Sequence, residues 1–170
     1  LAFGAVRDAV TPHGGVRGAL GALGALARWD ARAGGESEPL ADALQRARRL
    51  ALPGNRVLLL SDGTCTDAAA RAAMIRLKRR AEVLVLIIAD ALELDLPPAG
   101  SYTLQTAQAR MHADLLTPAA RARFRDALAA GHRALAELCD QTGVRWRRIG
   151  NGEDPSGALS DLLDPRRRSA

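Results

Sequence analysis

Two uninterrupted apolar runs dominate the hydrophobic pattern of the chain. They are Arg56–Ser61 (RVLLLS) and Val83–Ala89 (VLVLIIA), and an aspartate follows each of them. Continuous apolarity over such a length is typical of strands that are covered on both faces, as in parallel sheets. A third run, Val144–Ile149 (VRWRRI), alternates apolar and polar residues, which predicts an edge or half-buried strand. We interpret Leu1–Ala5 (LAFGA) as the end of a further strand.

Between these strands, apolar residues recur at the spacing of three and four that predicts amphipathic helices. The expected buried stripes are Val16/Leu20/Leu23/Ala27, Leu40/Leu44/Ala47/Ala51, Ala70/Ala73/Met74/Leu77, Phe124/Leu128/Gly131/Leu135/Leu138 and Leu159/Leu162/Leu163. Thr64 and Asp67 have the spacing of a capping box for the third of these helices. Thr117 followed by Pro118 favours the start of one long helix, which is expected to stop near Gly143.

The pattern changes after the second apolar run. Ser101–Leu104 and Arg110–Leu115 are predicted to pair as a small hairpin inserted near residues 101–115. The alternation of strands and helices elsewhere predicts an α/β fold, with a mostly parallel, Rossmann-like sheet and helices on both faces. The length suits one domain, which we place at residues 1–164, followed by a basic tail at 165–170.

Composition and charge exclude several classes of protein. The formal net charge is +5, and Lys78 is the only lysine among 24 basic residues. Because the arginines are spread evenly and lack neighbouring aromatic platforms, we attribute them to overall composition and expect no nucleic-acid surface. Cysteine and histidine lack the spacing of a zinc site or a disulfide framework. No apolar run approaches the roughly 20 residues of a membrane span.

Candidate chemistry lies directly after the apolar strands, because open parallel sheets bind ligands beyond the carboxyl ends of their strands. Asp62 and Asp90 occupy these positions. Together with a hydroxyl from Ser61, Thr64 or Ser37, they would suit a hard divalent cation such as Mg²⁺. The alternative is structural: both aspartates would cap helices or turns, which we favour for Asp90. Ser37 would similarly be a helix N-cap before Pro39.

Several segments carry a family resemblance. Val57–Gly63 (VLLLSDG) resembles the fourth-strand signature of von Willebrand factor A-type domains, an apolar strand that closes on Ser/Thr-Asp-Gly. Leu1–Gly4 is similar to the second strand of these domains, and Gly34–Gly35 before Leu40–Leu44 is similar to their glycine loop and its helix. The segments that narrow the resemblance to the MoxR-associated domain-of-unknown-function-58 proteins are Ala81–Val85, Asp90–Leu104, Gly143–Trp146 and Glu153–Pro155.

The resemblance implies a metal-ion-dependent adhesion site, in which the aspartate at the position of Asp62 holds Mg²⁺ or Mn²⁺ in the intact domain. Ser37 is the second candidate ligand, and Gly63, Thr64 and Asp90 form the expected binding edge. The family's Asp-x-Ser-x-Ser motif lies on its first strand, which is central in the sheet, and this chain contains no such motif.

We therefore expect that this first, central strand is missing and would precede Leu1. Its absence would leave one edge of Arg56–Ser61 unpaired, a hazard for aggregation if the edge is long and apolar.

The resemblance further implies a non-catalytic protein–protein interaction module. It would work with a MoxR-type AAA+ ATPase in protein maturation or complex assembly. Its location would be cytoplasmic, with a tether to the inner membrane through segments before Leu1.

Two other functions are kept as alternatives. Asp62–Thr64 resembles part of the Asp-x-Asp-Gly-Thr signature of haloacid-dehalogenase-type phosphatases, which would make the chain an Asp-dependent hydrolase. Leu60 stands where that chemistry needs a nucleophilic carboxylate, so we predict that the chain is not an enzyme. The second alternative is an arginine-rich nucleic-acid-binding domain.

Overall fold

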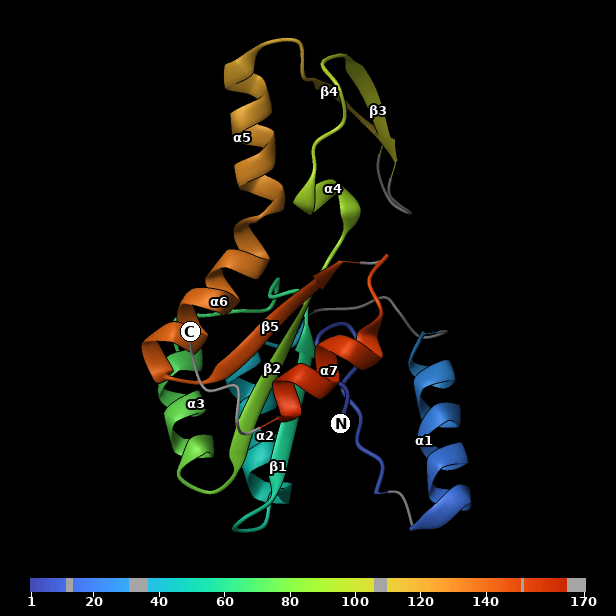
Figure 1. Ribbon diagram of the computed structural model, residues 1–170, viewed down its shortest axis with the longest axis vertical. Coiled ribbons are helices and arrows are strands. Elements are labelled where there is room, and N and C mark those ends of the chain that lie inside the picture. The colour runs from blue at the N-terminus through green and yellow to red at the C-terminus, as the bar shows by residue number, and fades with distance from the viewer. Residues whose placement is uncertain (12–13, 31–36, 106–109, 151, 165–170) are drawn as a thin grey trace. The chain divides into compact units, whose positions relative to one another are not determined.

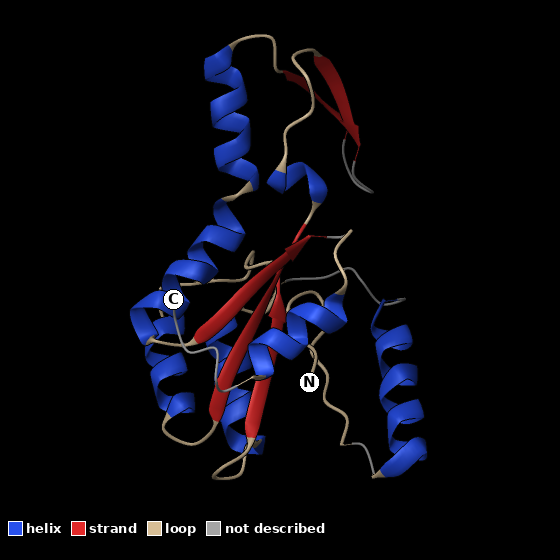
Figure 2. Ribbon diagram, viewed as in Figure 1, coloured by secondary structure: helices blue, strands red, loops and turns tan. Residues whose placement is uncertain are grey.

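From α1 onward, the strands and helices follow the predicted order, except that a short helix, α4, follows β2 and the predicted long helix is divided into α5 and α6 (Figures 1 and 2). The computed structural model describes residues 1–11, 14–30, 37–105, 110–150 and 152–164. Its elements are α1 (Gly15–Asp30), α2 (Leu40–Leu50), β1 (Arg56–Ser61), α3 (Ala70–Lys78), β2 (Glu82–Ala89), α4 (Ala91–Leu94), β3 (Ser101–Gln105), β4 (Arg110–Asp114), α5 (Pro118–Leu128), α6 (Ala130–Thr142), β5 (Arg145–Gly150) and α7 (Pro155–Leu163). The glycine pair Gly34–Gly35 and the basic tail 165–170 lie outside the described residues.

A parallel sheet of β1, β2 and β5, in that order, confirms the α/β prediction, and helices flank it. β2 is its central strand and aligns with β5 from Leu84 opposite Arg145 to Ala89 opposite Gly150. Consecutive residues of β2 from Val83 to Ile87 are buried. Because successive side chains of a strand point to opposite faces, this burial shows that protein covers both faces of β2. β5 lies at one edge, as its alternating pattern predicts.

The predicted hairpin is also present. β3 and β4 pair in antiparallel orientation, with Ser101 opposite Asp114 and Gln105 opposite Arg110. No helix within the described ranges has the length and apolar character needed to cross a membrane.

Two compact units make up the chain. The first consists of Leu1–Leu58, Cys65–Val83 and Gln141–Gly143, and the second of Leu59–Thr64, Leu84–Asp140 and Val144–Ala170. In the second unit, α7 packs against β2 and β5. Its buried Ala158 and Leu162 cluster with Leu84, Leu86 and Ile149. Each large apolar side chain buried in this way stabilises the fold by roughly 2 kcal/mol.

The long helix predicted to end near Gly143 is divided into α5 and α6. Thr117 caps α5 as predicted, since its hydroxyl accepts a hydrogen bond from the Ala120 amide at 3.1 Å. Ala129 then has ψ near −5°, away from the value of about −42° of a regular α-helix. The regular turn is interrupted there, two residues before Gly131.

α2 and α3 bury the faces that their sequences predict, but α1 does not. Leu40 and Leu44 of α2 and Met74 and Leu77 of α3 are all buried. In α1, however, the predicted stripe is solvent-exposed, with Val16 at 76%, Leu20 at 62% and Leu23 at 61%.

The buried face of α1 instead carries Gly18 and Ala25. Small residues allow a backbone to come close to its neighbour. At the end of the helix, the Trp29 indole Nε1 donates a hydrogen bond to Asp8 Oδ2 at 2.8 Å. This bond, and not the leucine spacing, identifies the side of α1 that faces the rest of the first unit, and the leucine spacing alone gave the wrong face.

Leu1–Ala5 is not a strand, contrary to our interpretation. Ala2 and Asp8 form an isolated antiparallel bridge, and Gly4 turns the chain with a positive φ of 88°. An extended strand cannot continue through this left-handed conformation. The segment from Ala2 to Asp8 is therefore a turn that is held in place by side chains from α2 and the loop before it.

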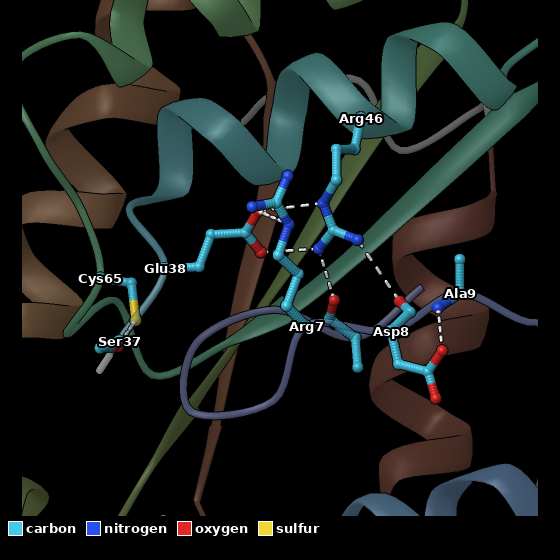
Figure 3. Close-up of polar contacts among 8 residues, drawn as sticks. Arg7, Asp8, Ala9, Ser37, Glu38, Arg46 and Cys65 are labelled. Atoms are coloured by element: carbon cyan, nitrogen blue, oxygen red, sulfur yellow. Dashed lines mark hydrogen bonds and ion pairs between the residues drawn. The ribbon is translucent and has the colours of Figure 1, made fainter. Parts of the chain in front are cut away.

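The strongest of these contacts is a buried ion pair between Glu38 and Arg46 (Figure 3). Arg46 Nε lies 2.9 Å from Glu38 Oε1, and Arg46 Nη2 lies 2.6 Å from Oε2. The same Nη2 donates to the Ala2 carbonyl at 2.7 Å. Arg7 Nε approaches Glu38 Oε1 to 3.4 Å from the solvent side. One guanidinium thus joins α2 to the N-terminal turn.

We predict that Arg46→Met destabilises the protein by about 3 kcal/mol, because it leaves the Glu38 carboxylate buried without its main partner. Urea unfolding measures this change. The matched control is Arg56→Met. Arg56 pairs with Glu82 at 2.7 Å, but both side chains are about half exposed. The control should cost under about 0.5 kcal/mol. Equal effects of the two substitutions would contradict the role of Arg46.

Candidate functional site

Asp62 begins a tight turn directly after β1. Its Oδ1 accepts hydrogen bonds from the Thr64 amide at 3.0 Å and from the Thr64 hydroxyl at 2.8 Å. Ser61 Oγ accepts from the Gly63 amide at 3.1 Å. Asp62 and Thr64 are both solvent-exposed. Asp62 therefore stabilises its own loop, as aspartates commonly do in turns.

The capping box predicted for Thr64 and Asp67 is absent. α3 begins only at Ala70, its N-cap is Ala69, and no side chain caps it. The helix starts too far along the chain for Thr64 to be its N-cap, and the Thr64 hydroxyl donates to Asp62 Oδ1 instead.

Gly63 lies at the closest backbone approach of this loop. It is buried and has a φ of 83°, in the region that favours glycine. A Cβ on Gly63 would lie 2.1 Å from the carbonyl oxygen of Gly131 in α6. A Cβ on Gly131 would in turn lie 3.1 Å from the Asp62 carbonyl oxygen and from the Thr64 amide nitrogen. Two glycines therefore let the loop and the start of α6 touch through their backbones.

Asp90, after β2, has the structural role favoured by its sequence position. It is the N-cap of α4, and its Oδ1 accepts from the Leu92 amide at 2.9 Å. Glu93 completes a capping box, because its Oε2 accepts from the Asp90 amide at 3.1 Å.

His132 is a residue of this region that the sequence analysis missed. It follows Gly131 on α6 and is 5% exposed. Its Nδ1 lies 3.5 Å from Glu93 Oε2 and has no hydrogen-bond partner. The sequence gives no signal that His132 is buried. Its burial results from the approach of α6 to the Asp62 loop, which the helical pattern alone does not indicate.

Ser37 belongs to the first compact unit and does not cap a helix, contrary to the structural alternative. The N-cap of α2 is Pro39, and the Leu40 amide donates to the Cys65 carbonyl at 2.8 Å. The Ser37 hydroxyl instead lies 3.0 Å from Cys65 Sγ (Figure 3). The Cys65 carbonyl, and not the Ser37 hydroxyl, therefore accepts a hydrogen bond at the start of α2.

Within the described ranges, no three His, Cys, Asp or Glu side chains come together as metal ligands. Cys139 is buried, and burial, with a smaller contribution from the nearby Asp140 charge, raises the pKa of its thiol to about 12. A thiol with that pKa stays protonated at neutral pH and is inert as a nucleophile.

Comparison with known proteins leaves the family open. No family model matches the chain, and neither the curated proteins nor the solved structures include a significant match. The resemblance to von Willebrand factor A-type domains therefore stays a prediction.

We predict that Gly63→Ala destabilises the protein by at least about 3 kcal/mol, because the new methyl group would collide with a backbone carbonyl at a left-handed position. Thermal and urea unfolding measure the change. Gly21→Ala in α1 is the control. Nothing lies within 4 Å of its added Cβ, and alanine should be neutral or stabilise the helix by up to about 1 kcal/mol. Wild-type stability of Gly63→Ala would show that the two backbones are not in contact.

Proposed function

We propose that this chain is a non-catalytic protein-interaction module and that its partner is a MoxR-type AAA+ ATPase. The family resemblance supplies the identity of the partner and the biological setting, which is protein maturation or complex assembly on the cytoplasmic side of a membrane. The apolar surface of β1 supports the protein-binding part of the proposal, and the structural roles of Asp62 and Asp90 support the absence of catalysis.

β1 carries this proposal because it exposes apolar side chains on a sheet. Leu58 is 37% and Leu60 54% exposed, while Leu59 between them is 8% exposed. Leu58 and Leu60 share one face, since side chains alternate along a strand. An exposed apolar face of this kind is a surface that protein partners commonly cover.

The donors at Asp62 do not by themselves fit the divalent cation that the resemblance implies. Asp62 supplies one carboxylate, whose Oδ1 is already bonded to Thr64. Asp90 is committed to the start of α4. We therefore assign partner binding by this chain to apolar contact with β1 and derive no step through Mg²⁺ or Mn²⁺.

The proposal predicts that Leu60→Asp weakens binding to an immobilised MoxR-type ATPase by about tenfold or more, because it places a charge in an apolar contact. Biolayer interferometry with the full chain measures the affinity. Binding should persist when a chelator such as EDTA replaces Mg²⁺, because the described donors do not complete a cation site.

Leu116→Asp is the matched control, since Leu116 is 62% exposed and lies outside the sheet. It should bind as the wild type does. Failure of the wild-type chain to bind the ATPase would overturn the choice of partner. Equal losses from the two substitutions would overturn β1 as the binding surface. Complete loss in chelator would instead assign binding to a cation.

A further inference from the structure

A hollow of about 440 Å³ lies beside the ends of α2 and α3, within the first compact unit. Its lining consists of Pro53 and four arginines: Arg48, Arg76, Arg79 and Arg80. In the sequence these arginines belong to two groups almost thirty residues apart, and the packing of α2 against α3 brings them together. We call this cavity, with the four arginines that line it, the arginine hollow.

The arginine hollow is unusual in its charge, because no acidic residue lines it. Some arginines elsewhere do have carboxylate partners, as Arg46 has Glu38 and Arg133 has Asp126. Arg48, Arg76 and Arg79, in contrast, make no hydrogen bond or ion pair with any part of the chain that the structure describes. All three of these arginines are solvent-exposed.

The fourth arginine is anchored. Arg80 Nε donates to the Ala51 carbonyl at 2.5 Å, which ties the segment after α3 to the end of α2. This bond keeps the two sides of the hollow together without help from a ligand. The cationic groups are therefore gathered in advance, which lowers the entropic cost of binding an anion.

A simpler explanation is that basic residues near helix C-termini stabilise the helix dipole. Arg48 and Arg76 lie in the last turns of α2 and α3 and do contribute in this way. Arg79 and Arg80, however, follow the last residue of α3. The helix dipoles therefore do not explain why arginines from two helices line one hollow that lacks carboxylates.

We propose that the arginine hollow binds an oligophosphate anion. Planar guanidinium groups bind phosphate oxygens through paired, charge-assisted hydrogen bonds. Four cationic groups exceed what one phosphate can neutralise, so the fitting ligand is a chain of linked phosphates. It is either a free oligophosphate or the sugar–phosphate backbone of a nucleic acid. The lining has no aromatic side chain on which bases would stack, so recognition is confined to the phosphates.

Calorimetric titration of the full chain with sodium tripolyphosphate tests the proposal. The variant Arg76→Gln/Arg79→Gln should bind at least about tenfold more weakly, because it removes two of the phosphate donors. Arg71→Gln/Arg123→Gln is the control, since it removes the same charge from exposed positions outside the hollow. It should bind within about twofold of the wild type at physiological salt, where distant charges are screened.

A parallel titration with a single-stranded oligothymidylate distinguishes the two phosphate sources. Binding of tripolyphosphate alone would support a free oligophosphate as the ligand. Binding of both, with the same sensitivity to Arg76→Gln/Arg79→Gln, would support a nucleic-acid backbone as well. The proposal is overturned if the wild type binds neither ligand or only the oligonucleotide, or if the control variant loses as much affinity as the test variant.

Discussion

The contact between the backbones of Gly63 and Gly131 is the constraint on which the second compact unit depends. It joins the loop after β1 to the first turn of α6, at a distance that leaves no room for a side chain on Gly63. His132, the next residue of α6, is thereby buried beside Glu93. Glu93 in turn caps the helix that follows β2, together with Asp90. The ends of β1 and β2 are thus linked to one helix by close packing and by turn hydrogen bonds.

This constraint has a direct consequence for function. Asp62 and Asp90 occupy the positions where an open sheet would place its chemistry, yet their carboxylates organise the loops that contain them. The surfaces left for recognition are the apolar face of β1 and the arginine hollow. The first is suited to a protein partner, and the second is suited to phosphate groups. Both proposed roles are binding roles, as expected for the interaction module that we propose.

Much of the fold was predictable because the relevant signals are local. The apolar run of β2 and the stripes of α2 and α3 depend on residues close in sequence, and the structure confirms them. β1 is a strand as predicted, but the prediction that both of its faces are covered was wrong, because Leu58 and Leu60 are exposed. α1 was assigned the wrong buried face, because the Trp29–Asp8 bond joins segments distant in sequence. For the same reason, no sequence pattern indicated the Glu38–Arg46 pair, the burial of His132 or the convergence of four arginines. Of the candidate site, the positions of Asp62 and Asp90 were predictable, but for Asp62 the sequence left a turn-stabilising role and a ligand role both open.

The central claim is that backbone contact with α6 holds the Asp62 loop in one conformation. Asp62 and Asp90, which follow the ends of β1 and β2, then stabilise the fold. Amide hydrogen exchange of the full chain, read residue by residue by NMR, tests this claim most directly. The amides of Gly63 and Thr64 donate hydrogen bonds to Ser61 Oγ and Asp62 Oδ1. We expect both to exchange as slowly as the amides of central β2, although they lie in a turn. Exchange at the rate of an unstructured loop would contradict the claim and leave Asp62 free for a catalytic or metal-binding role.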